Sequence, residues 1–428
     1  MGHGPGILDR RSEHEAQVCI LRHDPTRLEN LDRQRPQSEF HGGLEERVVV
    51  TEGPAGSPGA ECRAHRRLPD LEDGSNGTWK QMGNVAKTIF GYTTQFRALA
   101  SDVELTVPDL GVTVTAPTRG RAVRQAWEVA IKRLDAIAAS GLTPPPHASE
   151  GSYHEGVAQR VRRLNRQLVP HGYYVLPEDL SRKQVTNLES AAAKASGLVP
   201  PLPKEVEDEI VEALFDPIRG VQPRALNMVG LWMKADVLKE FSHVVEQAYM
   251  AFYTFEFISL MMVLAPVIEG VLLRWTGFDP SKPDAKPGSA ALLDFVAEKT
   301  CSDTSQMIHP LMVEEHIWAF ANVFEKLFFA WHTDAHNSGF FNRHYMAHLM
   351  GTGDFFRRNN VVRAMLLSDL LAHIVAACNG QHERFETGRE EYEERAAYYL
   401  ARAEHGLSNE GGLRYVKLMS EHKNFRFG

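Results

Sequence analysis

The spacing of apolar positions changes along the chain, and the change predicts where ordered structure begins. Residues 1–80 show no sustained apolar period and are rich in Arg, Glu, Gly, Pro and His, a composition typical of disordered chain. We expect this stretch to be a disordered or mis-annotated N-terminal extension, with Met82 as the start of the working protein. Regular patterning begins just after it.

Residues 85–150 have the pattern of a small α+β module. The segments TIFGYTTQFRALA, VELTVPDL and VTVTAP alternate apolar and polar side chains, as strands with one buried face do. The next segment, TRGRAVRQAWEVAIKRLDAIAAS, has an apolar stripe at helical spacing. The stripe consists of Ala122, Ala126, Ala130, Leu134 and Ile137. Gly141 stands where a helix is expected to stop, so the pattern predicts three strands and then a helix.

Residues 151–205 read as a basic helical segment followed by a linker. Four arginines lie close together in VAQRVRRLNRQLVP: Arg160, Arg162, Arg163 and Arg166. We expect the helix at 151–170 either to bind DNA or a protein partner or to be a solvated basic face. The proline-rich VPPLPKE then predicts a linker.

Helical spacing dominates residues 206–400, and residues 401–428 form a C-terminal tail in this interpretation. The most apolar stretch, FISLMMVLAPVIEGVLLRW, is interrupted by Pro266 and Glu269. Its uninterrupted run is shorter than the roughly 20 apolar residues that a bilayer requires, so we expect a buried core helix and no contact with a membrane. The predicted fold class is an α+β N-terminal module followed by a mainly α-helical bundle.

Composition narrows the classes of function. Apolar residues make up 43% of the chain and charged residues 24%, which is typical of globular protein. The formal net charge of −8 excludes a global basic field, so any nucleic-acid site must be local. The four cysteines have no metal-ligand spacing and the N-terminus has no signal pattern. Both observations favour a reducing cytoplasm.

The segment SGFFNRHYMAHLMGTG concentrates chemistry in an apolar region. Asn342, Arg343, His344 and His348 lie within seven residues of one another. A guanidinium matches phosphate oxygens, and an imidazole takes or gives a proton near neutral pH. Such a set is sufficient for RNA cleavage without a metal or cofactor, in which the 2′-hydroxyl attacks the adjacent phosphorus.

A metal site is the competing interpretation. Two H-x3-H pairs are formed by His332, His336, His344 and His348, and each pair can present two imidazoles on one helix face. Thr333 stands where the zinc-protease motif requires glutamate, and no cysteine joins the set. We therefore expect no metal.

FFNRHYMAHLMGTG resembles the NRH-x3-HG form of the arginine–histidine motif in HEPN-superfamily ribonucleases. VIEGVLLRW resembles an apolar helix that precedes the motif in those proteins, and RRNNVVRAMLLSDLLAHI resembles their final helix. The resemblance covers about 235–385 and implies a HEPN-like domain within the helical region. One position departs from the pattern, because Leu349 and Met350 follow the second histidine and Gly351 comes later.

By this resemblance Arg343 and His348 are the catalytic pair, His344 and Asn342 position or polarise the substrate, and Glu269 orients them from the facing helix. Residues five apart on a regular helix diverge by roughly 140°. Arg343 therefore has to lie on the incoming turn, or a second protomer has to complete the site. The resemblance implies a homodimer across the motif.

Three further arginines, Arg357, Arg358 and Arg363, follow the motif and are expected to hold RNA backbone. The alternative is that they belong to a solvated loop and helix start.

Two functions stay open. One is a HEPN-type endoribonuclease in toxin–antitoxin or phage-defence biology. The other is a non-enzymatic HEPN-like regulator that dimerises or binds RNA or nucleotides. Burial of Arg343 and His348 against core groups such as Glu269 would favour the regulator, and an open cleft the nuclease.

The module at 85–150 resembles the HicB-like antitoxin family in its PDLGVTVTA strand pair, its alanine-rich helix and its SGLTPPPHAS exit. The resemblance implies a ribonuclease-H-like fold with a binding role and no catalysis. Val112 and Thr113 leave little room for the turn that the family has after its proline–aspartate pair. Any small βββα module is the alternative.

Overall fold

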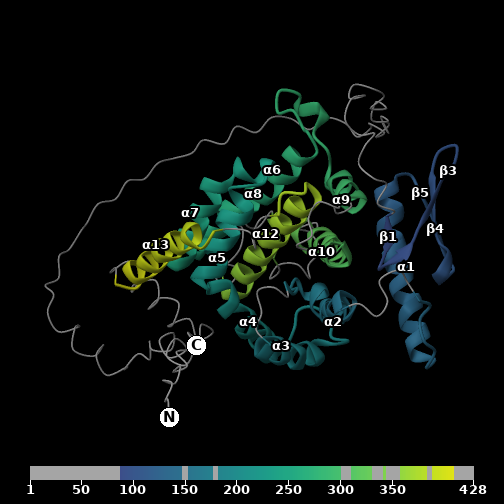
Figure 1. The fold of residues 1–428 in the computed structure, drawn as a ribbon, viewed down its shortest axis with the longest axis horizontal. Coiled ribbons are helices and arrows are strands. Elements are labelled where there is room, and N and C mark those ends of the chain that lie inside the picture. The colour runs from purple at the N-terminus through teal and green to yellow at the C-terminus, as the bar shows by residue number, and fades with distance from the viewer. Residues whose placement is uncertain are drawn as a thin grey trace, which may run out of the picture. The chain divides into compact units, whose positions relative to one another are not determined.

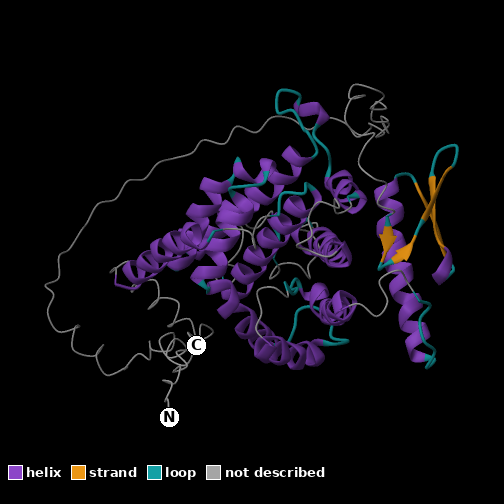
Figure 2. Ribbon diagram, in the orientation of Figure 1, coloured by secondary structure: helices purple, strands orange, loops and turns teal. Residues whose placement is uncertain are grey.

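The computed structural model describes part of the chain in seven segments: residues 87–146, 153–176, 182–299, 310–329, 341–343, 357–382 and 388–408. All of them belong to one compact unit, Ser75–Gly428. The expected extension at 1–80 and Met82 lie outside the described residues. The described part is mainly helical, with a small β region between residues 88 and 116 that is followed by helices (Figures 1 and 2). The coarse fold class is therefore confirmed.

Antiparallel strands form the β region. A two-residue hairpin pairs β1 (Thr88–Ile89) with β2 (Tyr92–Thr93). The second sheet has the order β3-β4-β5 and is built from Gln95–Ala98, Val103–Val107 and Val112–Ala116. The expected first strand is thus divided into β1, β2 and β3. The break between β1 and β2 is a chain reversal at Phe90 and Gly91, whose φ values are 54° and 87°. Alternation places Leu105, Val107 and Val112 in the core.

Helix α1 (Arg119–Ala139) covers this β region. The side chain of Thr118 caps it by accepting the amide of Arg121 at 3.1 Å. The predicted stripe is buried from Ala122 to Leu134. Gly120 sits under another helix, α9 (Ser289–Glu298): a Cβ at this position would lie 2.0 Å from the carbonyl oxygen of Asp294. The close approach of these two helices requires glycine there.

The remaining helices run from residue 153 to residue 408. The α-helices are α2 (Tyr153–Leu168), α3 (Arg182–Ala195), α4 (Lys204–Arg219), α5 (Val221–Asn227), α6 (Asp236–Lys239), α7 (Ser242–Tyr253), α8 (Phe257–Trp275), α10 (Pro310–Val323), α12 (Arg358–Cys378) and α13 (Arg389–Ser408). Two π-helical segments, η5 (Met228–Trp232) and η7 (Phe324–Phe328), extend α5 and α10. Short 3-10 turns are η3 (Val169–His171) and η6 (Pro283–Ala285), and a further one, η2 (Pro108–Leu110), lies between β4 and β5. Contacts cross the expected boundaries at 150 and 205, since α1 packs on α9, α2 on α10 and α3 on α4. Helix α13 continues past residue 401 into the expected tail.

Helix α12 lies at the centre of the bundle, against α4, α8 and α10 (Figure 1). Every residue from Asn360 to Ala377 is buried, the polar ones included. By length and apolar composition α8 and α12 are both long enough to cross a membrane, but 94% of the most apolar window of α12 and half of that of α8 are buried inside the protein. Such burial is typical of core helices.

A single carboxylate joins the β hairpin to the helical bundle. Glu314 of α10 accepts the amides of Phe90 at 2.7 Å and Gly91 at 3.4 Å. It also accepts the hydroxyl of Thr88 at 3.0 Å and the indole N–H of Trp127 at 3.3 Å. Phenylalanine rarely adopts a positive φ, and these charge-assisted bonds hold the strained turn in place.

The neighbouring residue, Glu315, is fully buried and pairs with Arg162 of α2. No described group hydrogen-bonds to its second carboxylate oxygen. Burial raises the pKa of Glu315 to about 7 against the opposing charge of Arg162. The folded protein therefore binds a proton at this carboxylate more tightly than the unfolded chain does.

We expect Glu315→Gln to change how stability depends on pH. Because the pKa of Glu315 is raised, the stability that its protonated form contributes to the folded protein is fully present below pH 4.5 and is lost as the pH rises through about 7. Glutamine mimics the protonated form, so the free energy of unfolding of the variant, measured relative to that of the wild type, should rise by roughly 2–3 kcal/mol between pH 5 and pH 8. Urea unfolding at pH 5, 6, 7 and 8 measures this difference.

The matched control is Glu189→Gln. Glu189 of α3 also pairs with an arginine, Arg160, but the hydrogen bond from Arg160 lowers its pKa. It titrates below the range tested, so its difference from the wild type should stay constant between pH 5 and pH 8. A Glu315→Gln difference that is equally flat would contradict the expectation.

Candidate functional site

The structure brings Arg343 and Glu269 together from positions 74 residues apart. Glu269 lies on α8, and one of its oxygens accepts a hydrogen bond from Arg343. Its other oxygen lies 2.8 Å from the ammonium group of Lys286. The Glu269 side chain is 16% exposed, whereas that of Arg343 is 33% exposed. The site is thus a carboxylate held between two cations at the edge of the solvent.

A distorted helix end positions Arg343. The end of η7 is π-helical, because the amide of Phe329 bonds the carbonyl of Phe324, five residues earlier, at 2.8 Å. The carbonyl of Leu327 accepts the side-chain amide of Asn342 at 3.4 Å. Asn342 is only 1% exposed, so it anchors the chain immediately before Arg343.

An aromatic ring supports the guanidinium. The guanidinium carbon of Arg343 lies 4.3 Å from the centre of the Phe329 ring, within the range of a cation–π interaction. Phe341 packs on Phe328, with ring centres 5.4 Å apart. Aromatic contacts on one side and Glu269 on the other fix the orientation of Arg343 before any ligand is bound.

Electrostatics keep Glu269 ionised at neutral pH. Its burial favours the neutral form, but hydrogen bonds and charges from Lys286 and Arg343 outweigh burial and lower the pKa of Glu269. The site therefore holds two positive charges and one negative charge. A net charge of +1 at a partly exposed guanidinium favours a phosphate over a cationic or neutral ligand.

Arg363 has an internal role and is not available to RNA. It is 3% exposed, and its three guanidinium nitrogens donate to the carbonyl of His171 at 2.9 Å, to Asn360 at 2.8 Å and to Glu207 at 2.5 Å. Its guanidinium also lies 4.3 Å from the Tyr173 ring. The expectation that it holds RNA backbone gives way to a structural role, because the apolar spacing of α12 buries it.

Arg357 and Arg358 stand at the start of α12 and are half-buried. The guanidinium of Arg358 lies 3.8 Å from the centre of the Phe215 ring. The two histidines of the motif, His344 and His348, lie outside the described residues, as do His332 and His336 of the alternative metal site. Within the described segments no group of three His, Cys, Asp or Glu side chains is arranged to hold a metal ion.

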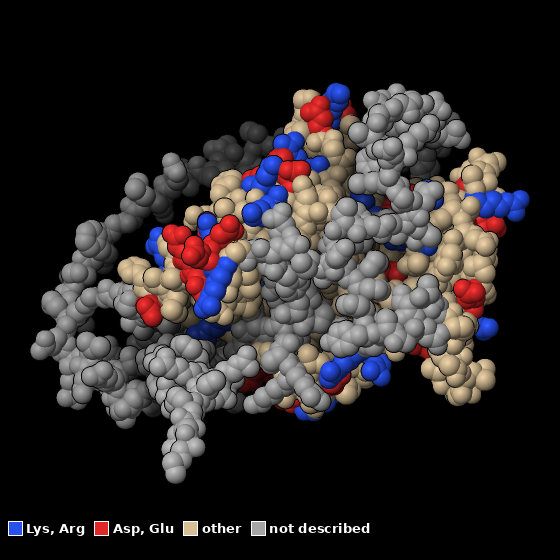
Figure 3. Space-filling view, viewed as in Figure 1, with Lys and Arg blue, Asp and Glu red and all other residues tan. Residues whose placement is uncertain are grey.

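The basic face of α2 is largely neutralised. Three of its four arginines pair with carboxylates of other elements: Arg160 with Glu189, Arg162 with Glu315, and Arg166 with Asp135. Arg163, the fourth, is exposed. On the described part of the face in Figure 3, acidic and basic side chains are interspersed, and acidic ones gather over α13. A nucleic-acid surface at 151–170 therefore gains no support from charge.

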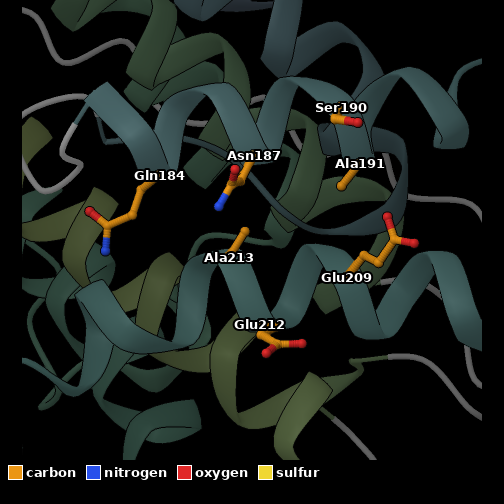
Figure 4. A pocket seen from close by; sticks show the side chains of 7 residues that line it. All are labelled: Gln184, Asn187, Ser190, Ala191, Glu209, Glu212 and Ala213. Atoms are coloured by element: carbon orange, nitrogen blue, oxygen red, sulfur yellow. The ribbon is translucent and has the colours of Figure 1, made fainter. Parts of the chain in front are cut away.

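A groove of about 400 Å³ lies between α3 and α4 (Figure 4). Its lining consists of Gln184, Asn187, Ser190, Ala191, Glu209, Glu212 and Ala213. Amides and carboxylates face the opening, and neither Arg343 nor Glu269 takes part. Lys194 pairs with Glu209 at 2.7 Å, and the lining includes no arginine or lysine, so this groove offers no cation to a phosphate.

Lys286 had no signal in the sequence. It lies in a proline-rich loop between α8 and α9, PSKPDAKPG, which reads as ordinary solvated chain. Only the tertiary contact with Glu269 distinguishes it from Lys282 in the same loop. Neither a family model, nor a curated protein, nor a solved structure matches this chain.

We expect Arg363→Met to unfold the bundle more easily. The methionine keeps an apolar stem but leaves the half-buried Glu207 without its cation and the His171 carbonyl and Asn360 without their donor. Breaking a buried pair costs about 3–5 kcal/mol, and the partial exposure of Glu207 places the expected loss at the lower end. Urea unfolding measures the loss. Arg389→Met, in an exposed pair with Glu393 on α13, should leave the midpoint unchanged. Equal midpoints for the two variants would show that the internal bonds of Arg363 do not stabilise the fold.

Proposed function

We propose that the helical region is a HEPN-type, metal-independent endoribonuclease acting in a toxin–antitoxin or phage-defence setting. The observation that carries the proposal is Arg343, which is oriented in advance by Glu269 and the Phe329 ring and keeps a third of its surface in solvent. A guanidinium that an aromatic ring holds in one orientation can stabilise charge on a phosphate without turning during the reaction.

The reaction follows from these groups. A base, His348 in this proposal, takes the proton of the 2′-hydroxyl, and the 2′-oxygen attacks the adjacent phosphorus. Arg343 stabilises the charge that builds on the non-bridging oxygens. The bond to the 5′-oxygen breaks, and that oxygen receives a proton. The products carry a 2′,3′-cyclic phosphate and a 5′-hydroxyl.

A non-enzymatic RNA-binding regulator is the second candidate. The observation that favours it is the pairing of Arg343 with Glu269, which neutralises the guanidinium in the absence of ligand. A phosphate then has to compete with a resident carboxylate. This arrangement suits reversible binding as well as catalysis, so the two functions differ in whether RNA is cut.

We expect the full-length protein to cut single-stranded RNA in EDTA and to leave 2′,3′-cyclic phosphate ends. Arg343→Ala and His348→Ala should each lower the rate by about 10²-fold or more, because each removes a group that acts in the transition state. Gel analysis of labelled RNA and end-group chemistry measure both effects. Arg274→Ala, which changes an exposed arginine near the end of α8, is the matched control.

The alternatives give different results in the same assay. Cleavage that is lost in EDTA would overturn the mechanism in favour of a metal held by the histidines. Uncut RNA that nevertheless binds, with an affinity that depends on Arg343, would replace the nuclease by the regulator. Loss of cleavage in Arg274→Ala to the same extent would show that the effect is not specific to the site.

A homodimer is part of the proposal. Helix α8 exposes Ile258, Met262 and Pro266, four residues apart, with exposed fractions of 41% and 38% for the first two. No charged residue lies between Phe257 and Ile268 on this helix, and Glu269 follows directly. An apolar stripe of this kind packs on the same stripe of a second copy around a two-fold axis.

We expect Met262→Asp to halve the molar mass in solution, because a buried, unpaired carboxylate at the centre of the stripe opposes association. Light scattering after size exclusion measures the mass. Met233→Asp changes an exposed methionine outside α8 and should leave the mass unchanged. A wild-type protein that is monomeric at tens of micromolar would contradict the dimer.

A further inference from the structure

Lys286 reaches the candidate site from a separate element. It follows η6 in the loop between α8 and α9, and its side chain is half exposed. Its ammonium group lies 2.8 Å from one oxygen of Glu269, while Arg343 bonds the other. The two cations thus meet at a single carboxylate from two separate segments of the chain.

The geometry of this triad matches the needs of a phosphodiester. A carboxylate and a phosphodiester each offer two equivalent oxygens with one negative charge. Arginine presents a planar fork of donors, and lysine presents a compact charge on a flexible stem. The two cations that divide the oxygens of Glu269 between them can divide those of a phosphate in the same way.

We propose that Lys286 is a second phosphate-binding cation of the site, and that Glu269 is a resident anion that holds Lys286 and Arg343 in place until a phosphate of the RNA replaces it. The inference rests on the proposed function and deepens it. It assigns Lys286 to substrate binding and gives Glu269 the role of a competitor for the same two cations.

The roles of the three residues then differ. Arg343 is fixed by Phe329 and acts on the charge of the reacting phosphate. Lys286 has no aromatic support in the described structure and contributes charge to binding. Glu269 weakens binding because the phosphate has to displace it, and it keeps the two cations from repelling each other in the free protein.

The test is binding of a fluorescent single-stranded RNA with 2′-O-methyl groups, which cannot be cut because the attacking hydroxyl is blocked. Full-length protein is titrated by anisotropy in EDTA at several salt concentrations. Lys286→Gln should weaken binding about fivefold and lower the slope of log Kd against log salt by about 0.7, the loss of one phosphate contact with a single strand. Glu269→Gln should strengthen binding severalfold.

Lys282→Gln is the matched control, since Lys282 lies in the same loop and is more exposed. Its ammonium group comes no closer than 3.9 Å to its partner, Asp279. It should leave both the affinity and the slope unchanged. A thermal unfolding curve for each variant verifies that it is folded. A variant that is partly unfolded would lower the total change in anisotropy but would leave the slope of log Kd against log salt unchanged.

The outcomes separate this inference from the proposed function. If Arg343→Ala loses affinity and slope while Lys286→Gln behaves as Lys282→Gln does, the assignment of Lys286 is wrong and the RNA site stands. If Glu269→Gln weakens binding, the competitor role is wrong. If Arg343→Ala changes neither quantity, the proposed function fails together with the inference.

Discussion

Burial of α12 on every side is the constraint on which the rest of the structure depends. A helix with no solvated face has to find partners for its charged side chains within the protein. Arg363 obtains its partners from η3 and α4, and Asp369 is held by Arg224 of α5 at 2.6 Å. His373 contacts His382, just beyond the helix, with ring nitrogens 3.0 Å apart. These bonds fix which elements surround α12 and in which rotation.

The same constraint places the candidate site. Helix α8 packs along α12 with its apolar face, and Glu269 lies at the edge of the buried surface of α8, with 16% of its side chain exposed. The two cations that meet Glu269 come from outside α8: Lys286 from the loop after η6, and Arg343 from the position that follows the buried Asn342. A largely buried carboxylate that meets a half-exposed lysine and an arginine supported by Phe329 is therefore the arrangement that this core produces.

Regular elements were predictable from the sequence because their signals are local. Alternation indicated the strands, and the stripe from Ala122 to Leu134 indicated α1 correctly. The turn at Phe90 was missed, because nothing local permits a bulky residue at positive φ. The net positive charge of the α2 face was overestimated from the sequence. Its arginines are neutralised by distant partners, such as Glu315, which lies 153 residues after Arg162. Lys286 was missed for the same reason: its partner is set by tertiary packing.

The Glu314 carboxylate has a consequence for the order in which contacts form while the chain is synthesised. Its bond to Phe90 joins residues 224 apart, and at roughly 5–20 residues per second a ribosome needs roughly 10–45 s to pass from one to the other. During that interval the hairpin has emerged without the acceptor that holds its strained turn. The hairpin therefore cannot complete this bond until α10 has been synthesised, and its turn forms last among the contacts of the β region with α1 and α10.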